Sequence, residues 1–199
     1  APAVVQSRGT AGVHAAGQVI HFDTTVQRSE RAWVYGANAN LPKTVSMQWA
    51  RVVDPQFHAR FSARRRRYRY VLFCRPVRPT FLAERVTWDY RDLDHTRMAL
   101  AARYFIGEHD FTSFKTRECQ ARSPVRSLYA AEISRSGQFI LFDVEANGFL
   151  HHMVRNLMGV LVAIGAGDAP VEWAKEVLEQ RDRTRGGVTA PAAGLYLTA

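Results

Sequence analysis

The sequence predicts an α+β fold whose sheet is antiparallel rather than doubly wound and parallel. Strand-like and helix-like segments alternate irregularly along the chain, whereas a parallel sheet requires regular crossovers between strand and helix. The turn Ser136-Gly137 separates two segments, at about residues 127–134 and 138–146, that are typical of a hairpin. With 199 residues, 47% of them hydrophobic, the chain can bury one good core or two small ones.

Local signals define the elements of the first part of the chain. Residues 19–22 are strand formers, and Ser29 can cap a helix that ends near residues 38–42. Apolar and polar residues alternate over residues 45–49, which is the period of a half-buried strand. Asp54-Pro55 then breaks the pattern, so we place a domain boundary there. The expected domains are residues 1–54 and 55–199.

The second part of the chain opens with a strongly basic segment. Four arginines, Arg64 to Arg67, lead into a strand at residues 68–73, in which Tyr68 and Tyr70 share one face and arginines occupy the other. The pattern then predicts a helix from Asp92 or Asp94 to Gly107, the hairpin, helices from about Phe149 and Val171, and a last strand at residues 194–197.

Charge narrows the class of partner. The formal net charge is +9, because 27 Lys and Arg outnumber 18 Asp and Glu. Such an excess favours an extended anionic partner, since each neutralised phosphate releases counterions, and nucleic acid is the natural candidate. An anionic membrane surface is the alternative, but the arginines are not gathered on one amphipathic helix, as that would require.

The sequence disfavours a membrane-spanning protein, a secreted protein and a protein that depends on a metal or cofactor. The most apolar helix candidate, residues 149–164, is interrupted by polar side chains and is not expected to span a membrane. The first residues lack the features of a signal peptide, which makes the cytoplasm the expected compartment. Cys74 and Cys119 lack CxxC spacing, and the seven histidines form no HExxH motif, so we expect reduced thiols, no metal and no cofactor.

The most informative stretch is Ser7 to Thr24, SRGTAGVHAAGQVIHFDT. Its closely spaced glycines permit a tight loop before a strand, and a lone loop of this kind is most often a surface turn. It is neither a dinucleotide-binding fingerprint nor a P-loop. It does resemble the signature of the A-type tRNA pseudouridine synthases, G-R-T-D-A-G-V-H-A, then G-Q-V, an apolar residue and F-x-T. The matching residues are Arg8, Ala11, Gly12, Val13, His14, Gly17, Gln18, Val19, Phe22 and Thr24.

Further blocks resemble the same family in the same order. They are residues 38–42, 57–63, 68–70, 107–114, 151–156, 190–192 and 194–197. The resemblance implies two ferredoxin-like halves that share a curved antiparallel sheet, with helices on the outer side and a basic cleft between the halves. Family members begin with a further strand and helix carrying Y-D-G and G-W-Q. Because this chain lacks those motifs, we expect it to be truncated by roughly one strand-helix unit.

The resemblance also implies site residues. The Asp of G-R-T-D is the family's catalytic residue, and alignment without gaps places Thr10 there. Tyr68 would pack on the target base and serve in proton transfer, and Arg155 would pair with the catalytic carboxylate. Arg8 would take the place of the flipped nucleotide, and Leu195 would wall the pocket. The remaining expected contacts are Gly12 and His14 on the substrate, and Arg64, Arg65, Arg66 and Arg67 on the RNA.

Each of these residues also has an ordinary structural interpretation. Tyr68 taken alone is more often a core or rim aromatic residue of a sheet. Arg155 can equally serve in a structural ion pair. Residues 64–67 can be a solvated edge that resists aggregation. Only the joint pattern favours a site.

Two functional hypotheses follow. The first is a cofactor-free tRNA pseudouridine synthase, homodimeric as in the family, that acts on positions 38–40 of the anticodon stem-loop. The reaction needs a buried ionised acid, whose pKa burial raises and a neighbouring arginine lowers. A threonine hydroxyl cannot take that role at neutral pH without an adjacent base, so Thr10 predicts impaired turnover. The second hypothesis is therefore a catalytically silent RNA-binding protein of the same fold.

Overall fold

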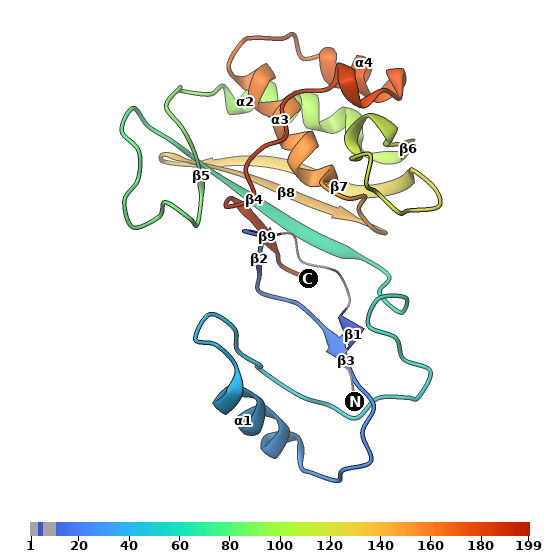
Figure 1. The fold of residues 1–199 in the computed structure, drawn as a ribbon. Helices are drawn as coiled ribbons and strands as arrows, with labels where there is room; N and C mark the ends of the chain where they lie inside the picture. Colours follow the sequence, from blue (N-terminus) through green and yellow to red (C-terminus); the bar gives the residue numbers. More distant parts are fainter. Residues whose placement is uncertain (1–3, 6–10) are drawn as a thin grey trace. The chain divides into compact units, whose positions relative to one another are not determined.

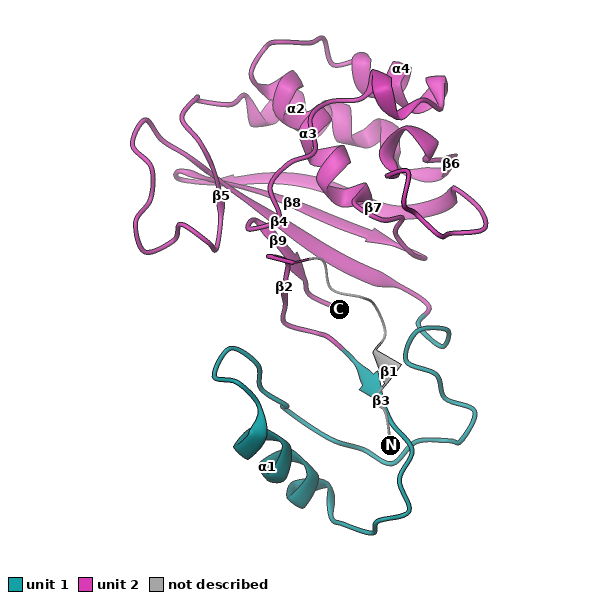
Figure 2. Ribbon diagram, viewed as in Figure 1, with its two compact units in different colours: residues 1–8, 19–63 teal, residues 9–18, 64–199 magenta. Residues whose placement is uncertain are grey.

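The computed structural model describes residues 4–5 and 11–199. The chain divides into two compact units, coloured separately in Figure 2. The first comprises residues 1–8 and 19–63, and the second comprises residues 9–18 and 64–199. In the described ranges, no helix is both long and apolar enough to cross a membrane.

The first unit contains a two-stranded sheet and one helix. Strand β1 (Val4–Val5) pairs antiparallel with β3 (Ile20–His21). Helix α1 (Glu30–Asn40) begins where Ser29 accepts a hydrogen bond on its Oγ from the backbone N–H of Ala32, at 3.2 Å. This serine satisfies one of the unpaired donors of the first turn, so the predicted capped helix is confirmed.

The strand predicted at residues 45–49 is wrong, because this segment forms no strand. Its backbone bonds to a side chain instead of a neighbouring strand. Asn38 donates from Nδ2 to the Met47 carbonyl oxygen at 2.9 Å, and its Oδ1 accepts from the Met47 N–H at 2.7 Å. Trp49 remains 61% exposed. Alternation predicts a strand only where a partner strand and a covered face are available.

The second unit is built on one open sheet with the strand order β2-β9-β4-β8-β7-β6, and β5 also pairs with β4. The pairs β4–β8, β7–β8, β6–β7 and β4–β9 are antiparallel, whereas β2–β9 and β4–β5 are parallel. The predicted α+β class with a mostly antiparallel sheet is confirmed. The strands are β2 (His14–Ala15), β4 (Arg66–Cys74), β5 (Thr87–Asp89), β6 (Gly107–Asp110), β7 (Val125–Ser136), β8 (Phe139–Ala146) and β9 (Leu195–Leu197).

Three helices, α2 (His95–Ala102), α3 (Met153–Gly165) and α4 (Trp173–Gln180), lie over one face of this sheet (Figure 1). Short 3-10 turns at Arg103–Phe105, Thr112–Phe114 and Arg183–Arg185 join them to the strands and loops. Tyr70 and Leu72 of β4 and Phe142 of β8 point into the core beneath the helices, where each is at most 1% exposed. The predicted hairpin is confirmed, and Gly137 adopts a φ of +57° at its turn.

Helix α3 begins four residues later than its sequence predicts. His152, the residue before the helix, has the left-handed φ of +60°. This conformation is uncommon for a residue other than glycine, so the surrounding contacts must hold it. About two turns further along, Gly159 meets the segment at residues 187–188, where an added Cβ would come within 1.8 Å of the Val188 carbonyl oxygen. The backbone that precedes β9 therefore lies directly against α3.

Candidate functional site

Strand β4 places Tyr68 at the end of the core. Its ring packs edge-on against Phe149, with the ring centroids 5.1 Å apart. Its neighbours in the sheet are Val144 of β8 and Leu197 of β9. Burial raises the pKa of the Tyr68 phenol, and the nearby Arg66 guanidinium partly offsets this effect. Tyr68 is therefore a neutral phenol at physiological pH, half-buried and in contact with a second aromatic ring.

Arg155 lies in the first turn of α3. Its Nε donates to the Ala190 carbonyl oxygen at 2.6 Å, and its own carbonyl oxygen accepts from the Ala190 N–H at 3.1 Å. Its Nη1 lies 3.2 Å from His152 Nε2. Burial lowers the pKa of Arg155. The two side-chain partners of Arg155 in the described part of the chain are thus a carbonyl oxygen and an imidazole, and neither is an acid.

Leu195 begins β9 and is 6% exposed. It pairs with Tyr70 of β4, which lies two residues along the strand from Tyr68 on the same face. The Tyr70 hydroxyl donates to the Pro191 carbonyl oxygen and Arg155 Nε donates to the Ala190 carbonyl oxygen, so the two side chains bind adjacent residues of one segment. The structure therefore brings Arg155, Leu195 and the tyrosine face of β4 together at one end of the sheet.

The end of the signature segment joins the same region. Strand β2 pairs His14 with Tyr196 and Ala15 with Leu197 of β9. The His14 ring stacks on the Tyr196 ring at 4.6 Å, and His14 Nε2 lies 2.9 Å from the Glu84 carbonyl oxygen. In this structure His14 has protein contacts on its ring face and on Nε2, which give it a role in fixing the segment.

Gly12 adopts a φ of +80°, and an added Cβ would lie 3.3 Å from the Ala192 Cβ. Only glycine adopts this backbone conformation without strain, which explains why the signature carries glycine at this position. Arg8 and Thr10, the two residues with the most specific expected roles, lie outside the described residues.

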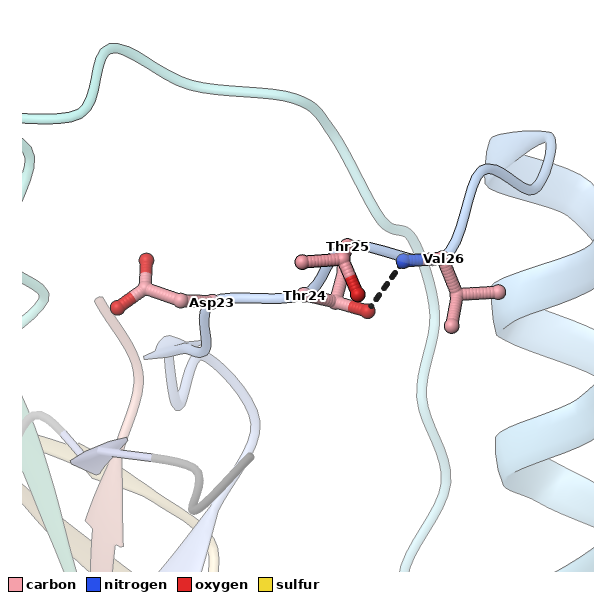
Figure 3. Close-up of a pocket in the computed structure, with 4 residues that line it drawn as sticks. All are labelled: Asp23, Thr24, Thr25 and Val26. Atoms are coloured by element: carbon pink, nitrogen blue, oxygen red, sulfur yellow. Dashed lines mark hydrogen bonds between the residues drawn. The ribbon is translucent and has the colours of Figure 1, made fainter.

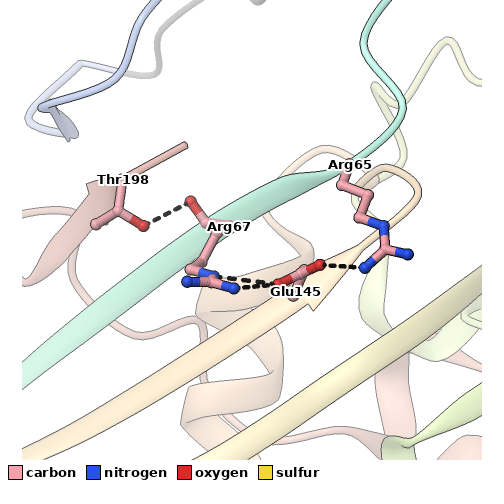
Figure 4. A network of polar contacts seen from close by, with 4 residues as sticks. All are labelled: Arg65, Arg67, Glu145 and Thr198. Carbon is pink, nitrogen blue, oxygen red and sulfur yellow. Dashed lines mark hydrogen bonds and ion pairs between the residues drawn. The ribbon is translucent and has the colours of Figure 1, made fainter.

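The four arginines do not share one face. Arg65 and Arg67 converge on Glu145 of β8, with Arg65 Nη1 3.0 Å and Arg67 Nη2 2.5 Å from its carboxylate oxygens (Figure 4). Arg66 lies on the opposite side of β4, where its Nη1 approaches Gly148. Arg64 precedes the strand and is exposed. Glu145 therefore neutralises part of the positive charge on the face of the sheet that the helices leave open.

An open depression of about 390 Å³ in the first unit is lined by Asp23, Thr24, Thr25 and Val26 (Figure 3). Thr24, which belongs to the signature, accepts a hydrogen bond on Oγ1 from the Val26 N–H at 3.1 Å. All four lining residues are exposed. Thr24 thus makes a local turn contact of the kind common for threonine, and the depression has no buried polar group that would define a ligand site.

His151 and His152 stack, with their ring centroids 4.0 Å apart. The His151 Nδ1 lies 2.7 Å from Thr116 Oγ1. Among the described residues, no group of three His, Cys, Asp or Glu side chains could hold a metal ion. The histidine pair is thus bound to the protein on both sides, with His152 against Arg155 and His151 against Thr116.

We expect the free energy of unfolding to decrease as the pH falls below about 6.5, the value of an unperturbed histidine. Burial and the charges of His151, Arg155 and Arg183 lower the pKa of His152, while Glu118 opposes them. The native state therefore resists a proton that the unfolded chain accepts. The stability that neutral His152 contributes is fully present above the pKa of histidine in the unfolded chain. It is lost as the pH falls through the lower pKa of His152 in the folded protein.

Urea unfolding measured from pH 7.5 to 5 tests this expectation with His152→Asn. Asparagine tolerates the left-handed conformation and does not titrate, so the substitution should flatten the pH dependence. His95→Asn, at the start of α2, is the matched control and should leave the dependence as it is. The expectation is wrong if both variants retain the parental pH slope.

Comparison with known proteins assigns the class and then the family. A family model described as tRNA pseudouridine synthase matches residues 101–199. The tRNA pseudouridine synthase A of Pseudomonas aeruginosa is 56% identical over 194 residues, which cover 98% of this chain and 68% of that protein. The proteins of the same name from Coxiella burnetii and Nitrosococcus oceani are 53% and 52% identical, covering 96% and 98% of this chain and 73% and 75% of theirs. The chain belongs to the tRNA pseudouridine synthase A family.

The family assignment agrees with the architecture. One open, mostly antiparallel sheet and the helices of the described residues are consistent with the pseudouridine synthase fold. The match continues through residues 153–165 and 195–197, which supply Arg155 and Leu195. The resemblance inferred from the sequence motifs is confirmed.

Proposed function

We propose that this chain is a tRNA pseudouridine synthase that isomerises uridine at positions 38–40 of the anticodon stem-loop. Membership of a family whose relatives are named tRNA pseudouridine synthase A supports the reaction class. One structural observation carries the assignment of the site. The end of the signature segment and the tyrosine face of β4 both pair with β9, and Arg155 bonds to Ala190 in the segment that leads into β9.

The reaction makes specific demands on these groups. The N1–C1′ glycosidic bond breaks, the base rotates and a C5–C1′ bond forms. C5 then loses its proton, and N1 takes up a proton. Tyr68 offers a neutral phenol that can stack on the base and pass a proton. Arg155 uses Nε and Nη1 within the described structure, which leaves Nη2 for the catalytic carboxylate. Gly12, His14 and Leu195 shape the rest of the site.

Thr10 stands where the family carries the catalytic aspartate, so this chain turns over little as written. A carboxylate is ionised at neutral pH, whereas a threonine hydroxyl needs a base to become a nucleophile. This one substitution favours a second candidate function, a catalytically silent tRNA-binding protein of the same fold. Both functions place Arg8 at the flipped nucleotide and tRNA on the basic surface.

The partner and compartment follow from the same proposal. A net charge of +9 suits a polyanionic tRNA, and the chain acts in the cytoplasm as a homodimer without a metal or cofactor. Sedimentation analysis tests the dimer, which should persist at micromolar concentration. A monomer at that concentration would contradict it.

The function is tested with tRNA labelled with tritium at C5 of uridine. We expect binding whose affinity falls steeply with salt, because phosphate contacts release counterions, and little release of tritium. Full turnover with Thr10 in place would show that the carboxylate is dispensable. An affinity independent of salt would contradict a phosphate-dominated binding mode.

Replacing Glu145 with glutamine should strengthen tRNA binding about threefold or more at low salt and steepen the salt dependence. Glu145 pairs with Arg65 and Arg67, and both arginines are otherwise well exposed. Removal of the carboxylate releases them for phosphate contacts. Filter binding over a range of salt concentrations measures the change.

Glu179→Gln provides the matched control, because Glu179 lies on α4 and pairs with Lys175 rather than with the arginines of β4. Its substitution changes the net charge by the same amount. We expect a smaller gain from Glu179→Gln. Equal gains from the two variants would mean that net charge alone, and not the arginine pair, governs the affinity.

A further inference from the structure

We propose that residues 186–192, here called the strap, position Arg155 and the signature segment for the reaction, and that Tyr70 is the positioning residue that holds the strap. The proposal rests on the proposed function and deepens it. Its basis is a continuous series of contacts from α3 through the strap to Gly12.

The first part of the strap is fixed on α3. Asn156 is 1% exposed, and its Oδ1 accepts from Thr189 Oγ1 at 2.7 Å and from Arg183 Nη2 at 3.1 Å. Arg183 also donates from Nη1 to the Gly187 carbonyl oxygen at 3.1 Å. On its other side, Asn156 donates from Nδ2 to the Phe114 carbonyl oxygen at 2.7 Å. Every polar atom of this buried amide is thus occupied, which specifies one arrangement of the backbone.

The middle of the strap is bonded to Arg155 itself. Ala190 exchanges two hydrogen bonds with Arg155, one through the guanidinium and one through the backbone. The guanidinium can therefore point towards the reacting groups only while Ala190 stays in place. A displaced strap would release Nε and allow the long side chain to take other rotamers.

The far end of the strap is held by Tyr70. The Tyr70 hydroxyl donates to the Pro191 carbonyl oxygen at 2.7 Å, and it accepts from Thr87 Oγ1, 2.5 Å away. Burial raises the pKa of Tyr70 to about 12, so the phenol remains a donor throughout the working range of pH. Tyr70 is 0% exposed, which leaves the bond without competition from water.

The strap then contacts the signature segment. Ala192 follows Pro191 directly, and its Cβ would lie 3.3 Å from a Cβ built on Gly12. The Leu195 N–H donates to the Ala192 carbonyl oxygen at 2.9 Å, which closes the turn into β9. Since β9 pairs with β2, a shift of Pro191 is passed through this turn and β9 to the signature segment at residues 14–16. Misplacement of a reacting group by about 1 Å can cost on the order of a hundredfold in rate.

The test compares Tyr70→Phe with its parent, both in chains that carry Thr10→Asp so that turnover is measurable. We expect kcat for tRNA to fall about tenfold while KM stays within about twofold, since the strap places reacting groups and does not bind the RNA. Hydrogen exchange followed by mass spectrometry should become faster in residues 186–194 and also in residues 11–18. The control is Val177→Ala in the buried face of α4, which lowers stability without touching the strap.

Each outcome decides the proposal. A kcat equal to that of the parent, or an equal loss of kcat in Val177→Ala at the same temperature, would overturn it. If the Thr10→Asp parent itself shows no turnover, the proposed function fails at that point, and the exchange data still decide the coupling. Tyr70→Phe without faster exchange in residues 11–18 would then overturn the role of the strap.

Discussion

We expect replacement of Thr10 with aspartate to raise the rate of pseudouridine formation roughly a thousandfold above that of the chain as written. The substitution restores the residue that the family signature carries at this position. Aspartate is ionised at neutral pH and can attack or take a proton directly. In the proposed site Arg155, with Nη2 unused among the described contacts, would provide the positive charge that keeps such a carboxylate ionised when it is buried.

Tritium release from C5-labelled tRNA measures the gain, and Thr10→Asn is the matched control. Asparagine has nearly the same shape as aspartate but carries no charge, so it should remain as slow as the parent. Arg155→Met in the Thr10→Asp chain should remove most of the gain. No gain from aspartate would place the defect elsewhere in the chain, and an equal gain from asparagine would show that the charge is not required.

Gly159→Ala should reduce the stability of the second unit by about 3 kcal/mol or more. A Cβ at this position would lie 1.8 Å from the Val188 carbonyl oxygen, and the backbone of Gly187 also approaches Gly159 closely. Both close neighbours are backbone atoms, which cannot rotate away as the end of a flexible side chain can. Either the strap leaves α3 or the helix shifts, and both changes break the contacts of Asn156 and Arg155.

Urea unfolding followed by far-ultraviolet circular dichroism measures the loss. Gly36→Ala in α1 is the control, since an added Cβ there has no atom within 4 Å. Because alanine is the better helix former, that substitution should be neutral or stabilising by up to about 1 kcal/mol. A Gly159→Ala protein as stable as its parent would contradict the close packing of the strap on the helix.

The sequence predicts this fold well where local signals and tertiary partners agree. Ser29 and Asp94 cap helices where expected, and the hairpin turns at Ser136-Gly137. Prediction fails at residues 45–49, because alternation carries no information about whether a neighbouring strand exists. It also starts α3 four residues early, since the left-handed φ of His152 depends on packing and not on a helix propensity.

The site is predicted only in part, for a related reason. The sequence places Tyr68 and Tyr70 on one face of a strand, and this alternation is confirmed by their shared orientation in β4. It cannot identify the Pro191 carbonyl oxygen as the partner of Tyr70, because the two residues are 121 positions apart. The pairing of Arg65 and Arg67 with Glu145 is equally invisible, since it depends on the register between β4 and β8.

Strand β2 has a consequence for solubility. It contributes only two residues, and it occupies the side of β9 that faces away from β4. An uncovered β9 would present unpaired backbone groups that can pair with another chain. The segment that follows Thr10 therefore also protects the edge of the sheet. Variants that release it should aggregate as well as lose activity, so inactivity and poor solubility would arise together from one local change.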